Sequence, residues 1–277
     1  MGAVAAQPRR ALDGGIRVVA HRGSSGDAPE HTLAAYRRAL EDGADGLECD
    51  VRLTRDGHLV CVHDRRIDRT SNGRGVLSTL ELAELSELDW GSWRESWDDF
   101  EDPEVPDRDR AGILTLRSLL EMVADSGRRV EVAVETKHPT RYAGLVERRL
   151  VELLDHFGWA HGRRDEPSPA RVMSFSQISL RRMHQMVPGL QTVLLMDRVP
   201  LRFRDGSLPP GVQVAGPSIE IVRAHPRYVQ RARARRHEVH VWTVDRRDDV
   251  SLCIDLGVDA IITNRPRRVL TALGQRA

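Results

Sequence analysis

The sequence predicts a (β/α)8 TIM barrel, formed as a single domain over residues 1–277 with a small insertion after the second barrel strand. Strand-like segments alternate with helical patterns along the chain, which is typical of parallel βα units. All but one of the strand-like segments are separated by enough residues for a crossover helix. The length of 277 residues also suits one barrel of this kind.

Nine segments have the pattern of strands, and we expect them at 16–20, 46–51, 59–62, 130–135, 171–175, 192–196, 212–215, 238–244 and 260–263. Helical spacing of apolar residues occurs between them. We expect helices at 32–40, 79–88, 116–124, 142–156, 179–186, 228–235, 248–256 and 266–273.

The third strand, 59–62, is the exception to the parallel pattern. Asp56-Gly57 is a strong signal for a two-residue hairpin loop, and too few residues precede the strand for a parallel crossover. We therefore expect this strand to return antiparallel, which leaves eight parallel strands. A two-residue loop would set Asp50 opposite His63, and a longer loop would shift that pairing by one residue.

Residues 64–115 break the regular alternation. This stretch carries Trp90, Trp93 and Trp97 among acidic residues, followed by prolines. We expect an insertion with a short helix that covers part of the barrel top. Its tryptophans could line a substrate entrance, but the packing of a small lid explains them more simply.

The composition excludes several classes of protein. The 42 basic residues nearly cancel the 41 acidic ones, so there is no electrostatic footprint for nucleic acid. No run is long enough to span a membrane, and the beginning of the chain lacks the pattern of a secretory signal. Cys49, Cys61 and Cys253 have neither disulfide nor metal-site spacing. We expect a cytoplasmic protein with no stable membrane anchor.

Polar residues follow the ends of several predicted strands. His21 and Arg22 end the first strand, and His63 ends the antiparallel return. The carboxyl ends of barrel strands form the face at which chemistry takes place. A single histidine is more often structural, but two of them beside charged residues on one face indicate catalysis.

Three carboxylates converge on the same face. Alternation along the second strand puts Glu48 and Asp50 on one side, and Glu135 faces the barrel axis from the next parallel strand. Clustered carboxylates are costly to bury unless a cation lies between them. An all-oxygen site suits Mg²⁺ or Ca²⁺ better than zinc.

Lys137 is the only lysine among the 42 basic residues. It shares the face of Glu135, one pleat higher, where an ammonium group would meet a phosphate. A general preference for arginine explains the other basic residues, so the exception points to a requirement at this position.

Together these segments resemble the glycerophosphodiester phosphodiesterase family. The resemblance covers about the whole chain and rests on His21-Arg22-Gly23, Pro29-Glu30-His31-Thr32, Glu48-Cys49-Asp50-Val51, Thr54-Arg55-Asp56-Gly57, His63-Asp64, Arg69-Thr70-Ser71-Asn72-Gly73, Glu135-Thr136-Lys137, Val241-Trp242-Thr243-Val244 and Ile261-Ile262-Thr263-Asn264-Arg265-Pro266. It implies a β/α barrel, one divalent cation, and hydrolysis of a small glycerophosphodiester to glycerol 3-phosphate and an alcohol.

The resemblance also implies a role for each matching residue. By this resemblance, the acid–base pair is His21 and His63, and the metal ligands are Glu48, Asp50 and Glu135. The phosphate contacts are Arg22 and Lys137, and Trp242 forms part of the pocket wall near the glycerol. His31 departs from the pattern because the family usually has Asn there.

Other readings stay open at this level. A phosphodiesterase on the same fold could act as a lysophospholipase D or like a sphingomyelinase. Lys137 could be the nucleophile of a Schiff-base lyase, although such a site has little need of three carboxylates. A barrel that binds phosphate without catalysis is a further alternative. The alcohol released, the preferred cation and the oligomeric state are left open.

Overall fold

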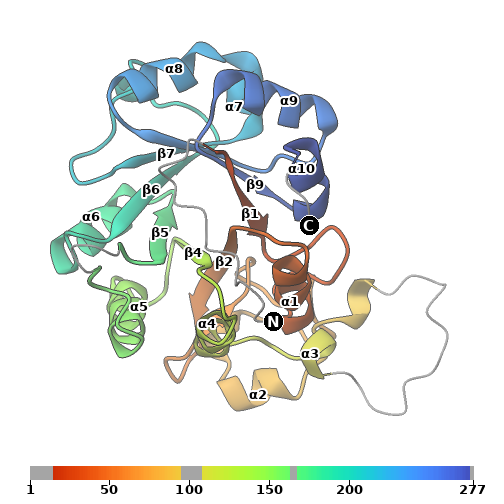
Figure 1. The fold of residues 1–277 in the computed structure, drawn as a ribbon. Helices are drawn as coiled ribbons and strands as arrows, with labels where there is room; N and C mark the ends of the chain where they lie inside the picture. Colours follow the sequence, from red (N-terminus) through yellow and green to blue (C-terminus); the bar gives the residue numbers. More distant parts are fainter. Residues whose placement is uncertain (1–14, 95–107, 163–166, 275–277) are drawn as a thin grey trace, which may run out of the picture.

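The computed structural model describes residues 15–94, 108–162 and 167–274 (Figure 1). Its nine strands are β1 (Arg17–His21), β2 (Gly46–Leu53), β3 (Leu59–Cys61), β4 (Glu131–Thr136), β5 (Ala170–Ser174), β6 (Gln191–Met196), β7 (Val214–Pro217), β8 (Glu238–Val241) and β9 (Ala260–Thr263). Each of them overlaps one of the nine expected strands.

Eight of the strands close into a parallel barrel. The order of hydrogen-bonded neighbours is β1-β9-β8-β7-β6-β5-β4-β2, and β1 pairs with β2 to close the ring. β3 lies outside the ring and pairs antiparallel with β2. The predicted (β/α)8 barrel is confirmed.

Helices surround the strands in Figure 1. They are α1 (Leu33–Glu41), α2 (Leu82–Ser86), α3 (Arg108–Ala111), α4 (Leu116–Ala124), α5 (Leu145–His156), α6 (Gln177–Met186), α7 (Ile219–Ala224), α8 (Arg227–Ala234), α9 (Arg247–Leu256) and α10 (Pro266–Ala272), with short 3-10 helices η2 (Leu77–Thr79), η3 (Ser92–Arg94) and η4 (Leu201–Phe203). The sequence pattern missed α3 and α7, which are too short to show a helical period. It also made α2 too long, because Thr79 belongs to η2 and the helix is capped at Glu81 and Glu87.

Alternation along the strands divides the apolar residues between two layers. Val132 and Val134 on β4 face the outer helices, whereas Ala133 faces the barrel axis. The axial layer is small and apolar; its buried members are Val19, Ala133, Met173, Val193, Leu195, Val214, Ala260 and Ile262. Because this layer fills the middle of the barrel, polar side chains on the axis are confined to its two ends.

The β2–β3 hairpin differs from the expected register by one residue. Leu53 pairs with Leu59 and Val51 with Cys61, so Asp50 lies opposite Val62 rather than His63. The loop has three residues rather than two, because the Gly57 amide closes a turn on the Thr54 carbonyl. Gly57 has a φ of 87°, the conformation that ends a three-residue hairpin loop.

The segment between β3 and α4 forms a small cluster of its own. Its buried residues include Ile67, Leu77, Leu85 and Trp90, which pack against Val62 after β3. Trp90 is a packing residue, as expected, and Trp93 is 40% exposed. Trp97 lies outside the described residues.

This segment contacts the loop between β1 and α1, on the face where the strands end. Arg94 donates hydrogen bonds to three carbonyl groups of that loop, those of Ser25, Gly26 and Ala28. It therefore borders the face that the sequence predicts to be functional.

No helix within the described ranges is long and apolar enough to cross a membrane.

The opposite end of the barrel holds a charged network at the starts of the strands. Arg17 binds Glu131 at 3.0 Å and also contacts Glu238. Arg171 pairs with Glu131, and His240 Nε2 lies 3.0 Å from Glu238. Burial, together with the charges of Arg171 and Arg17, lowers the pKa of His240 to about 4 against the opposing hydrogen bond to Glu238. The network balances its own charges, which suits a role in stability.

The neutral, buried state of His240 makes the stability of the protein depend on pH. The unfolded chain protonates this histidine near pH 6.5, whereas the folded protein does so only near pH 4. Stability is therefore lost as the pH falls from about 6.5 to about 4. Between pH 7 and pH 5, we expect His240 to account for a loss of about 2 kcal/mol.

Urea unfolding of the wild type and of His240→Gln at the two pH values measures this effect. The difference between pH 7 and pH 5 should be smaller in His240→Gln, and unchanged in His225→Gln, a control at an exposed histidine. An equal pH dependence in all three proteins would contradict the argument.

Candidate active site

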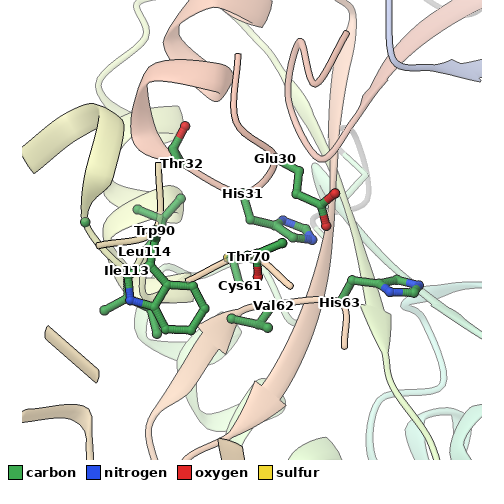
Figure 2. A pocket seen from close by; sticks show the side chains of 11 residues that line it. Glu30, His31, Thr32, Cys61, Val62, His63, Thr70, Trp90, Ile113 and Leu114 are labelled. Carbon is green, nitrogen blue, oxygen red and sulfur yellow. The ribbon is translucent and has the colours of Figure 1, made fainter. Parts of the chain in front are cut away.

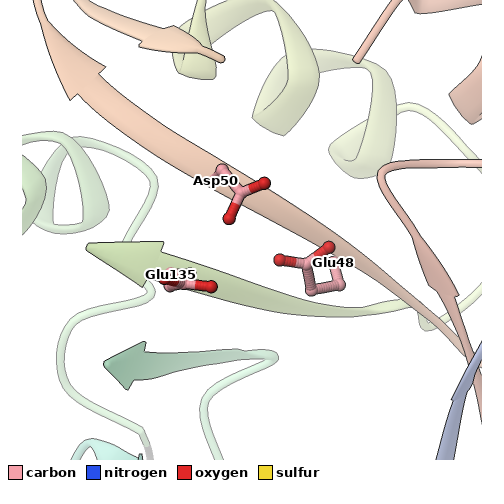
Figure 3. A group of neighbouring side chains, drawn as sticks. All are labelled: Glu48, Asp50 and Glu135. Atoms are coloured by element: carbon pink, nitrogen blue, oxygen red, sulfur yellow. The ribbon is translucent and has the colours of Figure 1, made fainter. Parts of the chain in front are cut away.

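Three carboxylates meet where β2 and β4 approach their ends (Figure 3). Asp50 is the register partner of Glu135, and Glu48 lies two residues before Asp50 on the same side of β2. One oxygen from each of the three lies within 4.8 Å of the others. Their exposed fractions are 2% for Glu48, 1% for Asp50 and 7% for Glu135, so water does little to separate their charges.

The three carboxyl groups differ in the direction in which the protein shifts their pKa values. Burial and the neighbouring Asp50 raise the pKa of Glu48 well above its usual range, and the same two causes raise the pKa of Glu135 to about 8. Burial would do the same to Asp50, but the hydrogen bond from His31 and the charge of Arg22 hold its pKa well below the usual range. Without a bound cation, the negative charge of the cluster is thus concentrated on Asp50. A cation held between the three carboxyl groups would favour the ionised forms of both glutamates.

Two cationic side chains lie directly against the cluster. Lys137 Nζ is 2.8 Å from Glu135 Oε1 and 3.1 Å from Asp50 Oδ1. Arg22 Nε is 2.9 Å from Asp50 Oδ2, but this contact lacks hydrogen-bond geometry. Asp50 Oδ1 is likewise buried and makes no hydrogen bond of good geometry, despite the nearby ammonium group.

These features fit a metal ion. The donors are all carboxylate oxygens, they come from rigid neighbouring strands, and one buried oxygen lacks a proper hydrogen-bond partner. Buried oxygens of this kind are ordinarily satisfied by a donor or a cation. Glu48, Asp50 and Glu135 therefore form an acidic cluster able to bind a metal ion.

His21 stands beside the cluster, at the end of β1. It pairs in register with Glu48, and its Nε2 lies 4.0 Å from Glu48 Oε2. Its Nδ1 lies 2.7 Å from Asn264 Oδ1, and the Asn264 amide group in turn donates to Asp245. An amide oxygen only accepts, so Nδ1 carries the hydrogen and Nε2 is free when the ring is neutral. Burial and the charge of Arg22 lower the pKa of His21 to about 4.

His63 lies after β3, and its side chain is about one-third exposed. Its Nδ1 is 2.6 Å from Asp64 Oδ1, which leaves Nε2 free in the neutral ring. Arg52 donates two hydrogen bonds to the His63 carbonyl, at 2.9 and 2.7 Å. These bonds hold the backbone of His63 close to the end of β2, although the register prediction was off by one.

A chain of ion pairs connects the His63 side to the carboxylates. Arg69 binds Asp64 at 2.5 Å and Glu30 at 2.7 Å, and Glu30 binds Arg22 at 3.0 Å. Although burial works against it, the hydrogen bond from Arg69 and the charge of Arg22 lower the pKa of Glu30 to about 2. Glu30 is therefore a fixed negative charge between two arginines.

The backbone after β1 is shaped for these contacts. Arg22 has a φ of 58°, which is unusual for a residue other than glycine, and its amide contacts both the carbonyl and the carboxylate of Glu48. Gly23 follows with a φ of 81°, and a Cβ there would lie 2.6 Å from the Ala35 backbone. The His-Arg-Gly motif thus combines a side chain that contacts the carboxylates with a turn that only glycine completes.

His31 is a buried partner of the cluster that the sequence left without a role. Its Nε2 donates to Asp50 Oδ2 at 3.0 Å, and its Nδ1 lies 2.9 Å from the Tyr36 hydroxyl. That hydroxyl donates to the Glu48 carbonyl. His31 has a φ of 63°, a conformation that Asn adopts readily, so the departure from the family pattern was the available signal.

Asn264, the partner of His21, and Asp245, which accepts from Asn264, were also missed. The motif around Asn264 was visible, but the contact joins positions 243 residues apart in the chain. Short-range spacing carries no information about such a pair.

Trp242 lies above the axial apolar layer and packs against it. Its indole donates a 2.7 Å hydrogen bond to the Gly216 carbonyl, and Phe175 meets it edge to face at 5.4 Å between ring centres. Among the described residues it has no hydrogen bond to the carboxylates. It offers an apolar wall across the barrel from β4.

A small cavity lies behind this arrangement (Figure 2). Its lining includes Glu30, His31, His63 and Trp90, and its volume is about 10 Å³. That is about the least space that holds one water molecule. This cavity is therefore too small to hold a substrate.

Comparison with known proteins agrees with this architecture. The glycerophosphoryl diester phosphodiesterase family model matches residues 21–268. A probable glycerophosphodiester phosphodiesterase 1 of Mycobacterium tuberculosis is 47% identical over 251 residues, 91% of this chain and 90% of that protein. A glycerophosphodiester phosphodiesterase of Bacillus subtilis is 32% identical over 91% of this chain and 84% of that protein.

Solved structures with the same fold cover nearly the whole chain. An Oleispira antarctica phosphodiesterase in complex with the product sn-glycerol-3-phosphate has a TM-score of 0.74 at 25% identity, over 95% of this chain and 99% of that one. The structure of a putative glycerophosphodiester phosphodiesterase from Galdieria sulphuraria has a TM-score of 0.77 at 21% identity, over 94% and 98% of the two chains.

If the carboxylates bind a cation, the cation should stabilise the folded protein. At a concentration one hundred times its dissociation constant, Mg²⁺ or Ca²⁺ should add about 2.7 kcal/mol to the free energy of unfolding. Glu135→Gln should abolish this gain. In chelator the variant should be nearly as stable as the wild type, because a carboxyl with a pKa of about 8 is mostly neutral at pH 7.

Thermal unfolding with and without chelator measures both quantities. Glu152→Gln, at an exposed glutamate on α5, serves as a control and should respond to the cation as the wild type does. A cation-dependent rise in melting temperature that survives Glu135→Gln would show that the ion binds elsewhere.

Proposed function

The chain belongs to the glycerophosphoryl diester phosphodiesterase family, and we propose that it hydrolyses glycerophosphodiesters to glycerol 3-phosphate and an alcohol, with one divalent cation and two histidines. The observation that carries the proposal is the buried group of three carboxylates, with His21 beside it and His63 held nearby. The bound product of the Oleispira antarctica phosphodiesterase supports glycerol 3-phosphate as the product here.

We assign the cation to Glu48, Asp50 and Glu135. Hard oxygen donors favour Mg²⁺ or Ca²⁺ over softer metals. When bound, such an ion supplies positive charge that stabilises the oxygens of a phosphodiester as it reacts.

Arg22 and Lys137 are the proposed phosphate contacts. Both lie within 3.1 Å of carboxylate oxygens in the structure, where they balance the charge of the cluster. If a cation balanced the charge of the carboxylates instead, the N–H groups of Arg22 and Lys137 would be available to a phosphate. Their fixed positions mean that little reorganisation is needed as charge develops.

His21 and His63 are the proposed acid–base pair. In each ring Nδ1 is engaged, by Asn264 or by Asp64, so that Nε2 is the atom left for proton transfer. One histidine takes a proton from the nucleophile and the other gives one to the leaving alcohol. The nucleophile is either water or the neighbouring hydroxyl of the glycerol.

Trp242 is the proposed wall for the glycerol half of the substrate. It lies at the end of β8 with Phe175 against its ring, and it closes the apolar top of the barrel axis. An aromatic wall suits the carbon face of a small polyol. The polar groups of the same ligand would then face the charged side of the site.

A lysophospholipase D activity is a second candidate. Its supporting observation is a set of exposed apolar side chains after β5 and β6: Phe175, Ile178 and Leu201 are 44%, 54% and 77% exposed. Such residues could contact the acyl chain of a lysolipid. The reaction at phosphorus would be the same.

The Schiff-base alternative fits less well. Burial alone would lower the pKa of Lys137, but its ion pairs with Asp50 and Glu135 raise it. A protonated ammonium group is not a nucleophile. For the cellular location we keep the cytoplasm as a proposal, in line with three cysteines that are free and buried.

Loss of either histidine should abolish most of the activity. His21→Ala and His63→Ala should each reduce kcat by about 10²–10⁴, the usual worth of a general acid or base. Release of glycerol 3-phosphate from glycerophosphocholine measures it. The control is His58→Ala, at an exposed histidine on the hairpin, and it should keep the wild-type activity. If His21→Ala retains most of its activity, the assignment of His21 is wrong.

Hydrolysis should require an added cation. We expect turnover of glycerophosphodiesters to stop in chelator and to return with Mg²⁺, Ca²⁺ or Mn²⁺, because the carboxylates otherwise hold Arg22 and Lys137. A panel of glycerophosphocholine, glycerophosphoethanolamine and lysophosphatidylcholine separates the two candidate functions. Full activity in chelator would refute the role of the metal.

A further inference from the structure

A cavity of about 190 Å³ opens beside Lys137, outside the carboxylate cluster. Its apolar lining comes from Leu53, Leu77 and Val146. Water occupies about 30 Å³ per molecule in the liquid, so the space is large enough for a substituent of the substrate. No residue of this cavity except Lys137 has a role in the proposed reaction.

The cavity is lined by an unusual concentration of positive charge. Arg52, Arg65 and Arg141 lie around it together with Lys137, and no carboxylate is among its described lining residues. Lys137 is paired with Asp50 and Glu135. Within the described ranges the three arginines form no ion pair with an acidic side chain. The charges of Asp50, Asp64 and Glu135 act on Arg52 from outside the cavity. The two exposed guanidinium groups of Arg65 and Arg141 can therefore form charge-assisted hydrogen bonds to an anion in this space.

Local contacts give the cavity a defined wall. The Tyr142 hydroxyl donates a 2.9 Å hydrogen bond to the Ser78 carbonyl, which joins the segment after β4 to η2. The guanidinium of Arg141 lies 5.7 Å from the centre of the Tyr142 ring. Arg52 is tied to the His63 carbonyl, so the cavity borders the backbone of a proposed catalytic residue.

The barrel closure fixes which half of a substrate would reach this cavity. In the ring of eight strands, β4 and β8 are four places apart and so lie on opposite sides. Lys137 follows β4, whereas Trp242 follows β8. A phosphodiester held over the carboxylates with its glycerol toward Trp242 extends its alcohol toward Lys137 and the arginines.

We propose that this cavity binds the alcohol half of the substrate and selects alcohols that carry a second anionic group, in particular a phosphate monoester. The inference rests on the proposed function and adds to it the class of the leaving alcohol. Arg65 and Arg141 are the residues that confer the selectivity, because both are exposed and able to turn toward an anion. The apolar lining accommodates the carbon frame that joins the two phosphates.

Two substrates that differ by one phosphate test the proposal. Glycerophosphoinositol and glycerophosphoinositol 4-phosphate have the same glycerol half and the same scissile bond. With wild-type protein and Mg²⁺, kcat/KM should be about tenfold higher for the phosphorylated substrate, as expected for one charge-assisted contact. The preference should arise in KM and shrink in about 0.5 M salt, which screens exposed charges.

Variants assign the preference to the cavity. Arg65→Gln and Arg141→Gln should each lower the ratio of the two kcat/KM values by several-fold, and the double variant should bring it close to one. Arg227→Gln removes the same charge from the exposed surface of α8 and should leave the ratio as in the wild type. This control separates a local contact from the effect of net charge.

The outcomes separate the inference from the function on which it rests. Equal kcat/KM values for the two substrates, or a ratio that survives the double variant, would overturn the inference while leaving the hydrolase intact. If wild-type protein with added cation hydrolyses neither substrate nor glycerophosphocholine, the proposed function fails and the inference fails with it.

Discussion

The burial of three carboxylates at one point is the constraint around which the functional face is built. Glu48, Asp50 and Glu135 repel one another where little water screens them, and rigid strands prevent them from moving apart. Arg22 and Lys137 lie against these carboxylates and balance part of their charge. The unusual backbone at Arg22 directs its amide to the Glu48 carboxylate, and His31 donates a hydrogen bond to Asp50. Both contacts stabilise the buried carboxylates.

The two ends of the barrel axis show opposite solutions to the burial of charge. At the starts of the strands, Arg17, Arg171, Glu131 and Glu238 neutralise one another around His240. At the other end, three carboxyl groups contact only two arginine or lysine side chains of the described residues, Arg22 and Lys137, and Asp50 keeps an oxygen without a proper hydrogen bond. A balanced network stabilises the fold, whereas an unbalanced one can bind an ion. The apolar layer between them keeps the two apart.

The sequence predicted the parts of the structure that depend on local pattern. Strand alternation was sufficient to assign Glu48, Asp50 and Glu135 to one face, since a residue's side of a strand follows from counting. The hairpin register was wrong by one because Asp56-Gly57 fits both a two-residue and a three-residue loop. The backbone hydrogen bond from Thr54 to His58, and an Asp56 without the positive φ of a type I′ turn, decide for three residues. The partners of His21 and Asp50, namely Asn264 and His31, come from loops whose paths depend on closure of the whole barrel.

The ion pairs that run from Asp64 through Arg69 and Glu30 to Arg22 have an evolutionary consequence. Each member is held by the charge of the next, so the effect of replacing one depends on which residues occupy the other positions. A substitution at half-exposed Arg69 therefore alters the charge around the buried carboxylates through Glu30 and Arg22, although Arg69 does not contact them. Related proteins should therefore differ at these positions together, even where His21, His63 and the three carboxylates are unchanged.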